Sequence, residues 1–293
     1  MSLTILLGIW LGGVFLLVED YEKFFEMTTE ERKQSIQEHP SILNDILETI
    51  GHEEAAIRDQ LNYRLFILLL SENALGETVI ADFVSKLSST DGLLYNIGEK
   101  GTTSVFQRSY AALYLAAIVN ADRQLVILTS EQLELLAQNA VALLTKEQDL
   151  RSFVDTKSGW AHSVTNTTEL IDAIIVHPLY PIRFTAQILQ GIRANIWKGY
   201  VFVDDEEERF CNIIQALLAK KIDEELFIEW FEQQFDQLEM VAYERGYDAL
   251  WFKARTNQLN LAKTLYFYLK FANRNEKLRS IVSTFIQRWL KLN

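Results

Sequence analysis

Apolar side chains recur every three to four positions along most of this chain, which is the period of an amphipathic α-helix. Within residues 53–70, for example, Ile57, Leu61 and Leu65 fall on one stripe. Residues 104–119, with the sequence SVFQRSYAALYLAAIV, are apolar almost all round, which is typical of a central, buried helix. No segment shows the convincing two-residue alternation of a strand, so the pattern predicts an all-α protein.

Capping and helix-breaking residues predict where these helices begin and end. Thr28 and Glu31 have the spacing of a capping box, and Pro40 ends the helix that they begin. Thr129 or Ser130 is expected to cap a later helix. The period and these signals predict about a dozen helices, over residues 28–39, 41–50, 53–70, 77–87, 104–119, 131–145, 159–177, 182–196, 204–220, 223–241, 257–271 and 276–290.

Short connections join the successive helices, as they do in stacked antiparallel helix pairs. Repeats of this kind keep their pattern while their sequences diverge. We therefore predict an irregular α-solenoid of HEAT-like antiparallel helix pairs, with a compact orthogonal helical bundle as the alternative. No linker rich in proline, glycine or serine interrupts the pattern, so residues 19–293 are interpreted as one helical domain.

The first 18 residues differ from the rest because Leu3–Val18 contains no charged side chain. A membrane-spanning helix needs about 20 apolar residues, so this run is short for a span. No lysine or arginine precedes it, and no small-residue cleavage site is evident. We expect a buried helix or a misassigned start codon, and membrane association through residues 3–18 is the alternative.

The balance of charges excludes one class of partner. The chain has 28 lysine and arginine residues against 40 aspartate and glutamate residues, a net charge of −12. A nucleic-acid-binding surface needs clustered basic residues, so we expect no nucleic-acid partner. Cys211 is the single cysteine, which rules out a disulfide within the chain and fits a reducing cytoplasm. Its apolar neighbours indicate a core residue.

Common catalytic and cofactor motifs are missing from the sequence. It contains no P-loop, no G-x-G-x-x-G, no G-x-S-x-G and no H-E-x-x-H, and its single cysteine and four histidines match no common zinc pattern. His39 and His177 each precede a proline at an expected helix end, and His52 lies in a turn. No partner is evident for these three histidines, so we predict no metal and no cofactor.

A cluster of polar residues stands out in the middle of this apolar chain. Charged groups in apolar surroundings need partners, because an isolated buried charge costs several kcal/mol. Arg108 is therefore expected to pair with Asp149 or Glu147. The cluster combines residues from the apolar helix, from the connection KEQDLRSF and from the segment that starts with GWAH: Arg108, Ser109, Glu147, Asp149, Arg151, Trp160, His162, Asn166 and Glu169.

Two interpretations of this cluster remain open. If GWAH begins a helix, the spacing of His162, Asn166 and Glu169 puts these three side chains on one face of it. The favoured interpretation is an ion-pair network that fixes the packing of helices. The alternative is a small polar pocket lined by arginine, tryptophan and histidine.

Three stretches resemble a bacterial protein family, the domain-of-unknown-function 2785 family. They are GHEEAAIRDQLNYRLF, VFQRSYAALYLAAIVNAD and EQDLRSFVDTKSGWAHSV, and NLAKTLYFYLKF is compatible with the same pattern. The resemblance covers roughly residues 45–275; it implies a helical protein and brings no activity. The family pattern places a second histidine four residues after the histidine of GWAH and an aspartate three further. Here those positions hold Asn166 and Glu169, so a metal or acid/base site is not expected on this face.

The leading functional hypothesis is a non-enzymatic helical scaffold whose surface binds a peptide, a protein or a small molecule. The alternative is a hydrolase or transferase, in which His162 acts as the base, oriented by Glu169 or a neighbouring carboxylate, and Arg108 or Arg151 holds an anionic substrate. The enzyme hypothesis requires His162, Arg108 and Asp149 to converge on an open cleft.

Overall fold

A computed structural model of the protein describes residues 18–291, and 13 α-helices make up most of them. The all-α prediction is confirmed. The first helices are α1 (Val18–Glu26), α2 (Thr29–Glu38), α3 (Ser41–Glu48), the π-helix η1 (Ala56–Tyr63), α4 (Arg64–Ser71) and α5 (Glu77–Leu87). The later ones are α6 (Ser104–Leu125), α7 (Ser130–Lys146), α8 (Ser163–Val176), the 3-10 turn η2 (Ile182–Phe184), α9 (Thr185–Ile196), α10 (Glu206–Ala219), α11 (Glu224–Arg245), α12 (Ala249–Ala272) and α13 (Glu276–Leu290).

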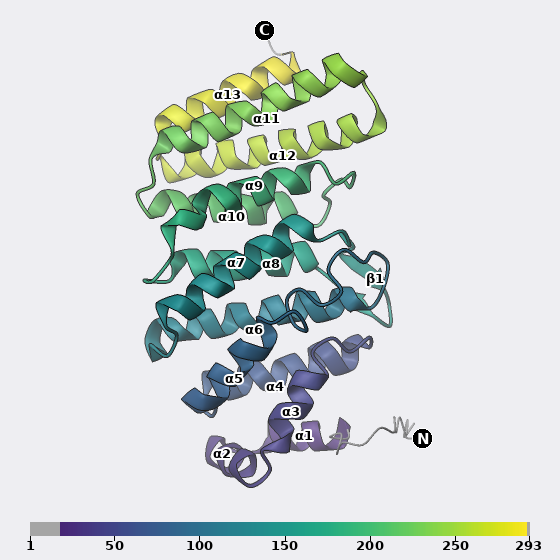
Figure 1. The fold of residues 1–293 in the computed structure, drawn as a ribbon, viewed down its shortest axis with the longest axis vertical. Coiled ribbons are helices and arrows are strands. Elements are labelled where there is room, and N and C mark those ends of the chain that lie inside the picture. Colours follow the sequence, from purple (N-terminus) through teal and green to yellow (C-terminus); the bar gives the residue numbers. More distant parts are fainter. Residues whose placement is uncertain (1–17, 292–293) are drawn as a thin grey trace.

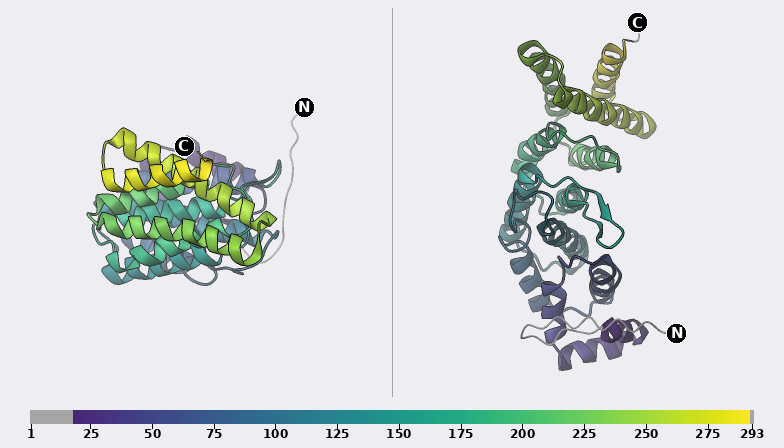
Figure 2. Two further views of the ribbon diagram at one scale, coloured as in Figure 1. Left: turned by 90° about the horizontal axis from the view of Figure 1, so that it is seen from above. Right: turned by 90° about the vertical axis from the view of Figure 1, so that its right-hand side faces the viewer.

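The helices stack along the long axis of the molecule in two layers (Figures 1 and 2). In one layer α6, α8, α10 and α12 pack side by side in that order, and in the other α7 packs against α9. α11 continues the second layer, because the indole Nε1 of Trp230 donates to the carbonyl of Leu189 in α9 at 3.0 Å. α13 packs on α12 and α11 at one end of the stack. Stacked antiparallel helix pairs require successive helices to alternate between the layers. The classification of this stack as HEAT-like stays a prediction.

The apolar helix α6 lies in the centre of the stack, as its sequence predicts. Ala112 and Ala116 are buried, and such small side chains let neighbouring helices approach closely. The helix runs on to Leu125, beyond the predicted end at residue 119. Its end is closed by the Asp122 carboxylate, whose Oδ1 accepts the amides of Ile127 at 2.6 Å and Leu128 at 3.0 Å.

Local capping signals placed several helix ends correctly. Thr28 and Glu31 form the predicted capping box at the start of α2, and Thr129 forms a second one with Gln132 at the start of α7. α5 and α13 have the predicted bounds. α12 begins at Ala249 and not at residue 257, because the Asp248 carboxylate accepts the amide of Trp251 at 2.7 Å and caps the helix there.

A short antiparallel hairpin of β1 (Phe153–Asp155) and β2 (Gly159–Trp160) is a correction to the prediction that no strand is present. The two strands are too short to show alternation in the sequence. Residues 155–159 form the turn between the strands, and Asp155 Oδ1 fixes it by accepting the amides of Lys157 at 2.9 Å and Ser158 at 2.6 Å.

The predictions for the N-terminus fall outside the part of the chain that the structure describes, apart from Val18, at which α1 begins. No helix within residues 18–291 is both long and apolar enough to span a membrane. The interpretation of residues 19–293 as one domain stays a prediction.

Candidate functional site

Arg108 and Glu147 form a fully buried ion pair at the centre of the predicted polar cluster. The guanidinium of Arg108, on α6, donates from Nε to Glu147 Oε2 at 2.7 Å and from Nη2 to Oε1 at 2.9 Å. Its Nη1 donates to the carbonyl of Tyr95 and to Ser104 Oγ, both at 2.9 Å. The side chain of Arg108 is 0% exposed. Glu147 is thus the partner, out of the two that the sequence allowed.

The Glu147 carboxylate connects three helices. It lies at the end of α7, receives the guanidinium from α6, and accepts a hydrogen bond from Ser163 Oγ at the start of α8 at 2.7 Å. The amides of Gln148 and Asp149 donate to its Oε1 at 2.9 Å each. A buried carboxylate is tolerated because its oxygens have this many donors.

Asp149 is buried too, but it pairs with Arg151 and not with Arg108. Arg151 donates from Nε and Nη2 to the Asp149 carboxylate at 2.8 and 2.6 Å, and the amide of Gly101 donates to it at 2.8 Å. Burial by itself would raise the pKa of Asp149, yet the Arg151 guanidinium and the main-chain amides of Gly101 and Arg151 hold that pKa below its ordinary value. Arg151 also donates to the carbonyl of Thr102 at 2.7 Å. The pair therefore fastens the loop before α6 to the segment after α7.

Ser109 and Asn166 hold the hairpin against α6. Ser109 Oγ donates to the carbonyl of Ala161, and Asn166 Nδ2 donates to Ser109 Oγ at 2.8 Å. The amide of Ala161 donates to the carbonyl of Ser152 at 2.7 Å. Asn166 therefore stabilises the end of the hairpin.

Trp160 and His162 lie at the surface side of the cluster. Their rings stack in parallel, with centroids 4.5 Å apart and planes 3° apart, and Trp160 also meets Phe153 edge to face at 5.2 Å. Nδ1 of His162 is buried without a hydrogen-bond partner. Burial lowers the pKa of His162, against an opposing effect of Asp204, so a neutral imidazole is favoured at neutral pH.

The helical face predicted for His162, Asn166 and Glu169 is not formed, because His162 lies outside the helix, which is a correction. GWAH does not begin the helix: Gly159 and Trp160 belong to β2, and His162 has a left-handed backbone with φ of 50°, directly before α8 starts at Ser163. Glu169 points to solvent and makes an exposed ion pair with Arg209 at 3.3 Å. Strand pairing at the hairpin overrides the helical spacing.

Two buried partnerships were missed by the sequence. Arg58 of η1 is 0% exposed, lies over the rings of Phe106 and Tyr110, and donates to the carbonyl of Ser158 at 2.7 Å. An arginine inside the apolar pattern of residues 53–70 was the available signal. The other is a histidine with no partner evident in the sequence.

That histidine is His177, and its expected lack of a partner is wrong. Its Nε2 lies 3.1 Å from Asp122 Oδ2, and both side chains are buried. This pair joins the C-terminal ends of α8 and α6. Cys211 is fully buried as expected, and burial raises the pKa of its thiol well above the ordinary value, which suits a core residue.

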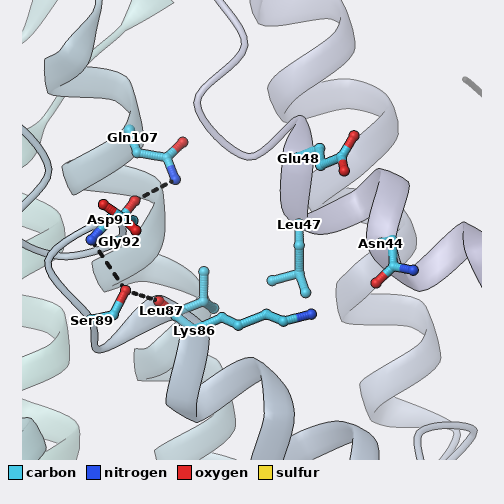
Figure 3. Close-up of a pocket in the computed structure, with 9 residues that line it drawn as sticks. All are labelled: Asn44, Leu47, Glu48, Lys86, Leu87, Ser89, Asp91, Gly92 and Gln107. Atoms are coloured by element: carbon cyan, nitrogen blue, oxygen red, sulfur yellow. Dashed lines mark hydrogen bonds between the residues drawn. The ribbon is translucent and has the colours of Figure 1, made fainter. Parts of the chain in front are cut away.

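Two surface cavities lie away from the polar cluster. One of about 310 Å³ lies between α3, the end of α5 and the start of α6, where Leu47 and Lys86 border it and Gln107 donates to the carbonyl of Asp91 at 3.2 Å (Figure 3). The other, of about 430 Å³, lies between α5 and α7 beside Leu135. None of the nine predicted site residues borders either cavity.

Comparison with known proteins decides the family. The model of the family described as "Protein of unknown function (DUF2785)" matches residues 93–267. The chain belongs to this family. DUF2785 is the family that the sequence resembled, although the match starts later than the expected residue 45 and leaves out the stretch at residues 51–66. No curated protein and no solved structure gives a match.

The enzyme hypothesis required His162, Arg108 and Asp149 to converge on an open cleft, and in this DUF2785 protein they do not. Arg108 and Asp149 are buried and hold partners within the chain, so neither side chain opens on a cleft beside His162. Within residues 18–291, no group of three or more histidine, cysteine, aspartate or glutamate side chains is placed to hold a metal ion. The side chains of Phe153 and Trp160 on the hairpin, by contrast, are exposed.

Proposed function

We propose that this protein is a non-enzymatic helical scaffold that binds a partner through the surface around its hairpin. The observation that carries the proposal is a pair of exposed aromatic rings on a backbone fixed from beneath. Trp160 is 43% exposed and Phe153 is 51% exposed. Large aromatic side chains lose little conformational entropy on binding and dominate the affinity of many interfaces.

The hairpin is fastened to the stack at several points. Arg58 donates to the carbonyl of Ser158, Ser109 donates to that of Ala161, and the amide of Ala55 donates to the carbonyl of Lys157 at 3.0 Å. A recognition surface that is already fixed before binding avoids the entropic cost of ordering it. The buried polar network therefore supports binding as a set of positioning residues, without touching the ligand.

The test is affinity capture from a lysate of the source organism with the full chain and with a Trp160→Ala/Phe153→Ala variant. Bound components, both macromolecules and small molecules, are identified by mass spectrometry. We expect at least one component to be retained by the wild type and lost with the variant, while far-UV circular dichroism of the two proteins stays the same.

A matched control is Phe271→Ala, because Phe271 is also an aromatic side chain at the surface, 79% exposed. It lies near the C-terminal end of α12 and is not part of the hairpin. This variant should retain the same component as the wild type. If the Trp160→Ala/Phe153→Ala protein retains everything that the wild type retains, the hairpin is not the recognition surface and the proposal fails.

A further inference from the structure

Four segments that are far apart in the sequence lie along the hairpin side of the stack, which we call the loop edge. They are residues 95–103, 149–162, 197–205 and 246–252, the last of which includes the first turn of α12. Ser152 Oγ donates to Glu206 Oε1 at 3.0 Å, and Glu206 Oε2 accepts the amide of Asp204 at 2.9 Å. These bonds fasten the hairpin segment to the start of α10. Glu206 itself is buried, so it acts as a fixed bridge between the two loops.

The loop edge continues to the start of α12. Lys253 Nζ donates to the carbonyl of Gly199 at 2.9 Å, and Asn257 Oδ1 accepts the amide of Phe202 at 3.0 Å. The loop between α9 and α10 is therefore held between the hairpin and α12. Figure 1 shows the hairpin and the turn between α11 and α12 on the same side of the stack.

Exposed apolar side chains are distributed along this edge. Beyond Phe153 and Trp160, Val203 is exposed on the middle loop, and at the far end Tyr247 is 71% exposed with its ring centroid 6.4 Å from that of Phe252. α10 packs between α8 and α12, and two helix-to-helix spacings of about 10 Å each put the starts of α8 and α12, beside the two aromatic groups, roughly 20 Å apart. An extended polypeptide covers that distance with about six residues.

Two carboxylates lie between the aromatic groups. Asp204 and Glu206 act electrostatically on His162, whose ring stacks on that of Trp160, and Arg209 acts on it in the opposite direction. Within the described residues, the carboxylates of Asp204 and Asp205 make no hydrogen bond or ion pair. A guanidinium can stack on an aromatic face and pair with a carboxylate at the same time, which a lysine ammonium does less well.

We propose that the loop edge binds an extended polypeptide segment that carries arginine side chains about six residues apart, one at the hairpin and one near Tyr247. The inference rests on the proposed binding function, since it names the class of partner for the same surface. The net charge of −12 favours a basic partner over an acidic one.

The probes are fluorescein-labelled 14-residue peptides in a glycine-serine background, measured by fluorescence anisotropy with the full chain. One peptide has two arginines six residues apart, a second has the arginines adjacent, and a third has glutamates in place of the spaced arginines. We expect the spaced arginine peptide to bind about tenfold more tightly than the adjacent one, since one lost cation–π and carboxylate contact is worth about 1.4 kcal/mol.

Variants locate the binding. Trp160→Ala, Tyr247→Ala and Asp204→Asn should each weaken binding of the spaced peptide several-fold, whereas Phe271→Ala on the opposite side should leave it unchanged. Any of three results overturns the inference. The arginine and glutamate peptides bind equally well, Phe271→Ala weakens binding as much as the loop-edge variants do, or neither arginine peptide binds.

The two proposals can fail separately. If lysate capture depends on Trp160 but the retained component is not an arginine-bearing polypeptide, the binding function stands and the partner class is wrong. If capture is independent of Trp160 and Phe153, the proposed function fails and the inference fails with it.

Discussion

Breaking the Arg108–Glu147 pair should destabilise the fold more than breaking any exposed ion pair of the protein. The Glu147 carboxylate accepts five hydrogen bonds: two from Arg108, one from Ser163 and two from main-chain amides. In Glu147→Gln, one oxygen becomes an NH₂ group that faces donors. In Arg108→Met, the carboxylate stays buried without its cation.

The magnitude follows from burial. Removing one member of a buried ion pair costs about 3–5 kcal/mol, because the other charge is left without compensation. Each single variant should lower the free energy of unfolding by that amount. The double variant Arg108→Met/Glu147→Gln removes both charges, so its loss should be smaller than the sum of the single losses by at least about 1 kcal/mol.

Urea unfolding followed by circular dichroism gives these free energies by linear extrapolation. The exposed pair Arg209–Glu169 is the control, since its side chains are 43% and 46% exposed and such pairs are worth about 0–1 kcal/mol. The reasoning is refuted if Arg108→Met or Glu147→Gln lowers the free energy of unfolding by less than breaking the exposed control pair does. It is also refuted if the loss in the double variant equals the sum of the two single losses.

Three further predictions concern other parts of the fold. Burial, with a smaller contribution from Glu169, raises the pKa of Asp172 to about 6, so the folded carboxyl holds its proton more readily than the unfolded one, and ionising it costs the folded state more stability as the pH rises from about 4 to about 6. Asp172→Asn should therefore raise the Tm of thermal unfolding at about pH 7.5, and this gain should shrink toward pH 4. A gain in Tm that does not depend on pH would contradict this. Gly159 has a φ of 66° and a Cβ there would lie 2.9 Å from a neighbouring side chain, so Gly159→Ala should cost more in urea unfolding than Gly101→Ala, where φ is 77° and the space is open. Loss of the capping box in Thr129→Ala should cost about 1 kcal/mol in the same assay, and Thr129→Ser should recover most of it.

Local signals determined the helical part of this protein. The apolar period, the capping boxes at Thr28 and Thr129 and the scarcity of proline and glycine act over a few residues, and they predicted the all-α class and most helix positions. The same locality explains the error at GWAH: the spacing of His162, Asn166 and Glu169 is helical, but Gly159 and Trp160 pair with Phe153–Asp155 as a strand, so the helix begins only at Ser163.

Burial in an apolar helix also showed that Arg108 needs a carboxylate, but not which one. Glu147 and Asp149 are two residues apart, and both carry a carboxylate that could pair with an arginine. The choice depends on how α6, α7 and α8 pack, and the packing turns Glu147 toward Arg108 and Asp149 toward Arg151. Sequence patterns contain no information on that orientation.

The sequence by itself therefore determined the class of fold, the helix caps and the need for a buried charge partner. Only the tertiary structure decided the pairs Arg108–Glu147, Ser109–Asn166 and Asp122–His177, whose members are 39, 57 and 55 residues apart. The physical reason is range: helix formation is set by neighbours within one or two turns, whereas pairing of polar groups and exposure of the hairpin rings depend on which distant segments the packed core brings together.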